Sequence, residues 1–126
     1  MDTKIEVIFV PVTDVDRAKS FYVDQVGFHA DHDQTPFEGL RFVQLTPPGS
    51  ACSIAFGTGL GIEMEPGSLH AIMAVVPDAD EARQHLLDHG VEASEVDEQA
   101  WGRFVRFKDP DGNGWTLQQL PKWAGR

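Results

Sequence analysis

The sequence has few of the features that mark several large classes of protein. Cys52 is the only cysteine among 126 residues, so an intramolecular disulfide and a four-cysteine zinc site are both impossible. No apolar run approaches the roughly 20 residues that a membrane-spanning helix needs. The opening residues, MDTKIEVIFVPV, lack the basic stretch and apolar core of a secretion signal. We therefore expect a soluble, cytoplasmic protein that makes no membrane contact.

Basic residues are also scarce. Ten lysines and arginines stand against 20 aspartates and glutamates, which gives a formal charge of −10. The field of such a chain repels phosphate backbones, so we expect no nucleic acid among its partners. An acidic surface would favour a cationic ligand, but acidity that serves only solubility explains the same composition. No phosphate-binding loop, zinc signature or Ser-His-Asp order is present.

What the sequence does contain is an internal repeat. At an offset of 64 residues, Val12, Asp14, Asp16, Ala18 and Asp24 align with Val76, Asp78, Asp80, Ala82 and Asp88. At an offset of 62, residues 40–45 align with residues 102–107. A period of this length, present twice, indicates two copies of one supersecondary unit. The chain is too short for two independent cores, so we predict one domain over 1–126. It comprises module 1 at about 3–56, a linker at 57–68 and module 2 at about 69–120.

Each module is predicted to contain a strand, a helix and three further strands, which makes the fold class α+β. In module 1 the helix begins after Asp14, runs through Val15 to Val26 and ends at Gly27. In module 2 it begins after Asp78 and ends before Gly90. Alternation of β-branched and aromatic residues predicts the strands at 5–12, 28–32, 40–45, 51–56, 70–76, 91–96, 103–107 and 115–119.

Two segments resemble a known family. VPVTDVDRAKSFYVDQVGF is similar to the opening strand and helix of the vicinal oxygen chelate superfamily, and KDPDGNGWTLQQL to its closing turn and strand. This superfamily includes glyoxalase I, extradiol dioxygenases and the bleomycin-resistance proteins. The resemblance implies two tandem βαβββ modules that form a curved, mixed-sheet cup. It also implies pairing of modules within or between chains, and we expect a homodimer.

The resemblance places the usual metal ligands of this superfamily at Val7, Ser53, Ala71 and Thr116. Transition metals require imidazole, carboxylate or thiolate donors, which none of these four residues supplies. His70 is one residue out of register, and in a strand it would face the other side. His85 and His89 lie four residues apart on one helix, but on its polar side and without a third ligand. We therefore expect no metal and no cofactor.

The strand periodicity predicts which side chains line the cup, because alternate residues share a face. The predicted lining is mostly apolar, has Arg106 as its one strong charge, and comprises Val7, Phe9, Phe42, Gln44, Ser53, Ala55, Ala71, Met73, Phe104, Arg106, Thr116 and Gln118. An apolar cavity with few polar anchors is typical of small-molecule sites. A cup filled by its own side chains or by a dimer partner fits the same residues.

Three functions are compatible with this pattern. The first is a metal-free protein that binds an apolar or aromatic small molecule in the cup, as in the bleomycin-resistance branch. The second is a metal-dependent lyase, isomerase or dioxygenase of the same superfamily, which would have to use ligands other than Val7 and Ala71. The third is a metal-free enzyme in which Arg106 performs electrostatic work.

Overall fold

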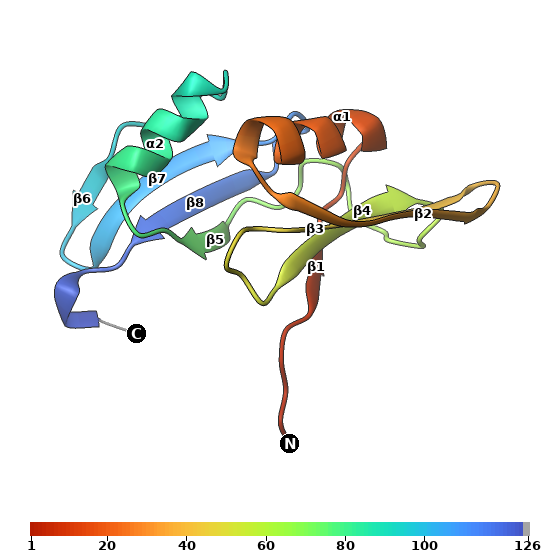
Figure 1. Ribbon diagram of the computed structural model, residues 1–126, viewed down its shortest axis with the longest axis horizontal. Coiled ribbons are helices and arrows are strands. Elements are labelled where there is room, and N and C mark those ends of the chain that lie inside the picture. Colours follow the sequence, from red (N-terminus) through yellow and green to blue (C-terminus); the bar gives the residue numbers. More distant parts are fainter. Residues whose placement is uncertain (125–126) are drawn as a thin grey trace.

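The fold consists of two small mixed sheets with two helices on one side (Figure 1). A computed structural model describes residues 1–124 of the chain. The elements in chain order are β1 (Val7–Phe9), α1 (Val15–Ser20), a wider helical segment η1 (Phe21–Val26), β2 (His29–Phe37), β3 (Leu40–Thr46), β4 (Ser53–Thr58), β5 (Ile72–Val75), α2 (Ala79–Asp88), β6 (Asp97–Gln99), β7 (Gly102–Lys108), β8 (Gly114–Gln119) and a short 3-10 helix η2 (Lys122–Ala124).

The two sheets have the same topology. Their strand orders are β1-β4-β3-β2 and β5-β8-β7-β6. In each sheet the first strand runs parallel to the last, and the other neighbours are antiparallel. This arrangement confirms the predicted α+β fold of two tandem βαβββ modules. None of the helices described is long and apolar enough to span a membrane.

The helix starts follow the predicted capping pattern. The Asp14 carboxylate accepts a hydrogen bond from the Arg17 amide at 3.0 Å, and Asp78 accepts from the amides of Asp80 and Glu81 at 2.9 and 3.1 Å. These bonds satisfy amide groups that have no partner inside the helix. At the other end of the first helix, Gly27 has φ +101°, a left-handed conformation that glycine adopts readily.

The first helix is less regular than predicted. It is α-helical only to Ser20, and the turns widen from Phe21 to Val26. The amides of Gly27 and Phe28 both donate to the Tyr22 carbonyl, at 2.9 and 2.8 Å. This wider spacing is π-type geometry. Phe21 and Tyr22 are both buried in this segment.

One predicted strand is wrong. Residues 91–96 are not a strand, and β6 covers Asp97–Gln99 instead. The Ser94 amide does bond to the Arg106 carbonyl on β7, at 2.9 Å. However, the Arg106 amide donates to the Ser94 hydroxyl, and the Ser94 carbonyl accepts from Arg83 Nε. In a regular antiparallel ladder the Arg106 amide would donate to the Ser94 carbonyl. Here both groups bond to side chains instead, so no strand forms.

The same kind of ion pair ties each helix to its own sheet. Arg41 on β3 contacts Asp16 in the first turn of α1 at 2.7 Å, and Arg103 on β7 contacts Asp80 on α2 at 2.9 Å. The repeat aligns Arg41 with Arg103 and Asp16 with Asp80, so equivalent residues form the two ion pairs. The two modules thus hold their helices in equivalent ways.

Both sheets turn one face toward a common core. The buried residues of this face include Val43, Leu45, Ile54 and Phe56 from sheet 1 and Val105, Phe107 and Trp115 from sheet 2. The first helix joins the two sets, since Phe21 lies 6.3 Å from Phe107 and Tyr22 lies 5.8 Å from Trp115, measured between ring centroids. Because the helices and the shared core occupy one side, the opposite side of both sheets is left uncovered (Figure 1).

Candidate functional site

The uncovered side of the two sheets, here called the open face, carries the residues predicted to line the cup. On sheet 1, cross-strand pairing aligns Val7 with Ser53 and Phe9 with Ala55. Gln44 also pairs with Ala55, and Phe42 with Gly57. Directly paired residues share a face of a sheet. The six predicted residues of module 1 therefore lie together.

Sheet 2 shows the same relationship. Met73 pairs with Thr116, which in turn pairs with Arg106. Gln118 pairs with Phe104 on β7 and with Val75 on β5. Ala71 lies one residue before β5 and two before Met73. The predicted residues of module 2 thus form a second group on their own sheet.

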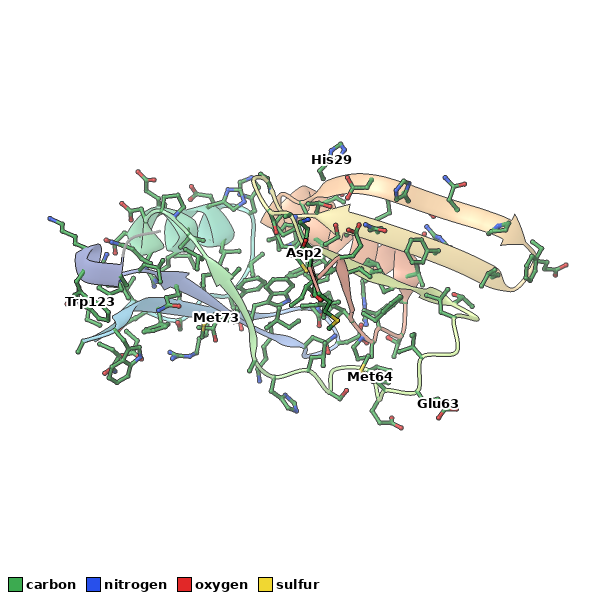
Figure 2. The ribbon with its side chains drawn as sticks, turned by 90° about the horizontal axis from the view of Figure 1, so that it is seen from below. Asp2, His29, Glu63, Met64, Met73 and Trp123 are labelled. Atoms are coloured by element: carbon green, nitrogen blue, oxygen red, sulfur yellow. The ribbon has the colours of Figure 1, made fainter. Side chains whose placement is uncertain are left out.

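Within one chain the open face includes apolar side chains that are exposed. Met73 is 59% exposed and its neighbour on the same face, Val75, is 51% exposed. Figure 2 shows the molecule from below, the side away from the helices, with Met73 labelled on β5. Some predicted lining residues are shielded, because Ala55 is fully buried and Phe104 is 4% exposed. The face therefore offers exposed apolar side chains at its middle and covered ones elsewhere.

Aromatic rings and one guanidinium group shape the open face. The rings of Phe9 and Phe42 meet edge to face at 6.4 Å between centroids. On sheet 2 the guanidinium carbon of Arg106 lies 5.8 Å from the centre of the Phe104 ring. Arg106 also contacts the Asp97 carboxylate at 3.3 Å. Protein groups therefore already neutralise part of the Arg106 charge.

The open face does not fit the metal of the superfamily that the sequence resembles. Val7 and Ala71 have no donor atom, and Ser53 and Thr116 offer only neutral hydroxyl groups. Ser53 is buried and hydrogen-bonded to Thr46. Among the described residues, no three histidine, cysteine, aspartate or glutamate side chains cluster closely enough to hold a metal ion.

A groove of about 440 Å³ runs between the two sheets. Ile8, Cys52 and Ser53 line it from sheet 1, and Ile72, Met73 and Val75 from sheet 2. Ser53 and Met73 also belong to the predicted lining of the cup. The volume suits a small organic molecule, and most of the side chains that line the groove are apolar.

The sequence analysis missed one polar cluster on sheet 1. Thr46 pairs with His29 across β2 and β3, and its hydroxyl donates to the Asp31 carboxylate. The Thr46 and Ser53 hydroxyl oxygens are 2.6 Å apart. A bulge near Asp31 shifts the β2 register, so simple alternation could not have placed this carboxylate. Because Thr46 is two residues after Gln44 on β3, strand alternation predicts that both lie on the same face. This pattern could have identified Thr46 from the sequence.

Comparisons with known proteins agree with this architecture. The family model described as Glyoxalase/Bleomycin resistance protein/Dioxygenase superfamily matches residues 4–117. The curated protein YetH of Bacillus subtilis (strain 168), described as uncharacterized, is 28% identical over 122 residues, which are 94% of this chain and all of YetH.

Two solved structures are similar in sequence and in shape. TnmS3, an antibiotic binding protein from Streptomyces sp. CB03234, is 34% identical with a TM-score of 0.86, and the match covers 95% of this chain and 98% of TnmS3. A superfamily member from Sphaerobacter thermophilus DSM 20745 is 30% identical with a TM-score of 0.82, covering 94% and 98% of the two chains.

Proposed function

This chain belongs to the Glyoxalase/Bleomycin resistance protein/Dioxygenase superfamily, and we propose that it binds an apolar or aromatic small molecule on its open face without a metal ion. The observation that carries the proposal is the residue set at Val7, Ser53, Ala71 and Thr116, which has no strong metal donor. The similarity to TnmS3, an antibiotic binding protein, supports small-molecule binding over catalysis.

We further propose that a second copy of the chain completes the site. Met73 and Val75 on the open face are exposed, as is Ile5 just before β1, and such side chains are costly to leave in water. A homodimer that brings the open face of one copy against that of the other would cover these side chains. The dimer would also enclose a ligand between the open faces of the two copies, which would make a closed pocket.

The enzyme alternatives have less support. A metal-dependent lyase, isomerase or dioxygenase would need donors that the four ligand positions do not supply. A metal-free enzyme that uses Arg106 would need a free guanidinium and a base beside the substrate. Arg106 instead contacts Asp97 and lies over the Phe104 ring.

Binding can be tested with a neutral aromatic probe, 2-naphthalenemethanol, titrated into isotopically labelled protein. We expect amide NMR shifts in β1, β4 and β5, which supply residues to the groove beside the open face, and little change in α2. Met73→Lys should weaken binding about tenfold, since it places a charge against the ring. Leu87→Lys, on the far side of the molecule, is the matched control. Shifts confined to α2, or no shifts at millimolar probe, would contradict the proposal.

A further inference from the structure

One residue of the groove wall, Ser53, belongs to a cluster of hydrogen-bond acceptors. This acceptor cluster consists of Asp31, Thr46 and Ser53, linked by the Thr46–Asp31 hydrogen bond and by the 2.6 Å Thr46–Ser53 contact. Ser53 belongs both to the cluster and to the wall of the groove. The groove and the cluster therefore adjoin at Ser53, a buried residue, while Asp31 and Thr46 lie outside the groove wall.

The hydrogens of the cluster can be assigned by counting. Asp31, as a carboxylate, only accepts, so the Thr46 hydroxyl must donate its single hydrogen to Asp31. The Thr46–Ser53 contact then requires Ser53 to be the donor. Once Ser53 has donated its hydrogen, its oxygen offers only lone pairs. Asp31 thus presents acceptors and no donors to a ligand, while Ser53 is buried and bonded to Thr46.

The charge of the cluster is not balanced by the chain itself. Asp33, two residues after Asp31 on β2, forms ion pairs with Lys19 at 2.8 Å and with Arg41 at 2.9 Å. Asp31 has no lysine or arginine within 4 Å among residues 1–124, and its nearest basic group is His29 Nε2 at 3.8 Å. Its side chain is 27% exposed. A negative charge that no lysine or arginine of residues 1–124 neutralises therefore lies two hydrogen bonds away from Ser53 on the groove wall.

We propose that the acceptor cluster recognises a positively charged amine on the ligand, whose apolar body lies in the groove against Met73 and Val75. An ammonium group carries several donors and no acceptor, which complements the Asp31 carboxylate. Hydrogen bonds between charged partners are about twice as strong as neutral ones. The chain's charge of −10 adds a long-range attraction for cations. This inference rests on the proposed function, because it specifies the ligand of the same site.

Four naphthalene probes of one size test the inference. They carry an ammonium (2-naphthylmethylamine), a hydroxyl (2-naphthalenemethanol), a methyl ether (2-methoxymethylnaphthalene) or a carboxylate (2-naphthoate). Dissociation constants come from NMR titration of the full chain at neutral pH. We expect the ammonium to bind about tenfold more tightly than the alcohol, because it makes a hydrogen bond between charged partners. The ether and the carboxylate should bind more weakly than both.

A near-isosteric variant assigns the preference to the cluster. In Asp31→Asn the ammonium-to-alcohol affinity ratio should fall from about ten to near one, since the charge is lost. Glu38→Gln removes the same charge at the exposed β2–β3 turn and should leave the ratio unchanged. Because the ratio is measured within one variant, partial unfolding does not alter it.

The outcomes separate the two proposals. If all four probes bind at the open face with equal affinity, or the carboxylate binds best, the amine inference is wrong and the proposed function stands. If Asp31→Asn keeps the wild-type ratio, the cluster is not the amine site. If no probe binds, the proposed function fails and the inference fails with it.

Discussion

Tyr22 donates its phenolic hydrogen to Asp109 at 2.8 Å, a bond that joins the first helix of module 1 to the turn before β8 in module 2. Trp115 Nε1 donates to the same Tyr22 oxygen at 3.0 Å, and Asn113 donates to Asp109 at 2.8 Å. All four side chains are buried. Burial, together with the Asp109 carboxylate, raises the pKa of Tyr22 far above its usual range, so the phenol stays a donor.

Tyr22→Phe should destabilise the protein by about 1–3 kcal/mol, because Trp115 loses its acceptor and Asp109 loses a donor inside the core. The measurement is urea unfolding at pH 7. Thr13→Val removes the 2.7 Å hydrogen bond from Thr13 to Asp111, which also joins the two modules but is exposed. Since Thr13 is exposed and Asp111 keeps its hydrogen bonds from the Thr13 amide and Arg17, this control should cost less than about 1 kcal/mol. Equal losses in the two variants would contradict the role given to the buried network.

Acid should lower the free energy of unfolding, partly because Asp33 becomes protonated. The hydrogen bonds from Arg41 and then Lys19 hold the pKa of Asp33 well below its usual range. A carboxyl group whose pKa is lowered by folding adds stability above its unfolded pKa of about 3.9, and this stability is lost as the pH falls further. Asp33→Asn should therefore be less stable than wild type by about 1 kcal/mol at pH 7.

The difference between Asp33→Asn and wild type should shrink steadily as the pH falls from about 5 to about 2. Free energies of unfolding measured in urea across this range give the comparison. Asp24→Asn is the control, because Asp24 is exposed and makes no ion pair in the part of the chain that the structure describes. A gap between Asp33→Asn and wild type that stayed constant with pH would rule out the ion pairs as its cause.

The proposed dimer makes a separate prediction. Light scattering after size exclusion should give a mass of twice 13.9 kDa for the wild type at micromolar concentrations. Met73→Lys should raise the dimer dissociation constant by tenfold or more, about 1.4 kcal/mol, because a charge would be buried at the interface. Leu87→Lys adds the same charge on α2 and should leave the mass unchanged. A wild-type monomer would contradict the dimer.

The sequence predicted the fold well because two independent signals agreed. The repeat indicated two modules, and Asp14 and Asp78 indicated where the two helices begin. The structure confirms both helix starts. Strand ends were less accurate, since β1 covers only Val7–Phe9 and β2 extends to Phe37. Edge strands and strand ends depend on tertiary pairing, which a local pattern does not contain.

Strand alternation also predicted which side chains share the open face, as the pairing of Phe9 with Ala55 and of Met73 with Thr116 illustrates. It could not place Asp31, because the β2 bulge breaks the period of two. It could not show how the two sheets pack against each other either. That arrangement depends on the packing of Phe21 and Tyr22 against Phe107 and Trp115 in the shared core.

Metal content tests the central claim most directly. The protein would be equilibrated separately with zinc, nickel, manganese and, without oxygen, ferrous iron, then dialysed and analysed by mass spectrometry. Because Val7, Ser53, Ala71 and Thr116 supply no strong donor, we expect far less than one metal ion per chain in every case. One tightly held ion per chain would contradict the metal-free binding site and favour a metal-dependent enzyme.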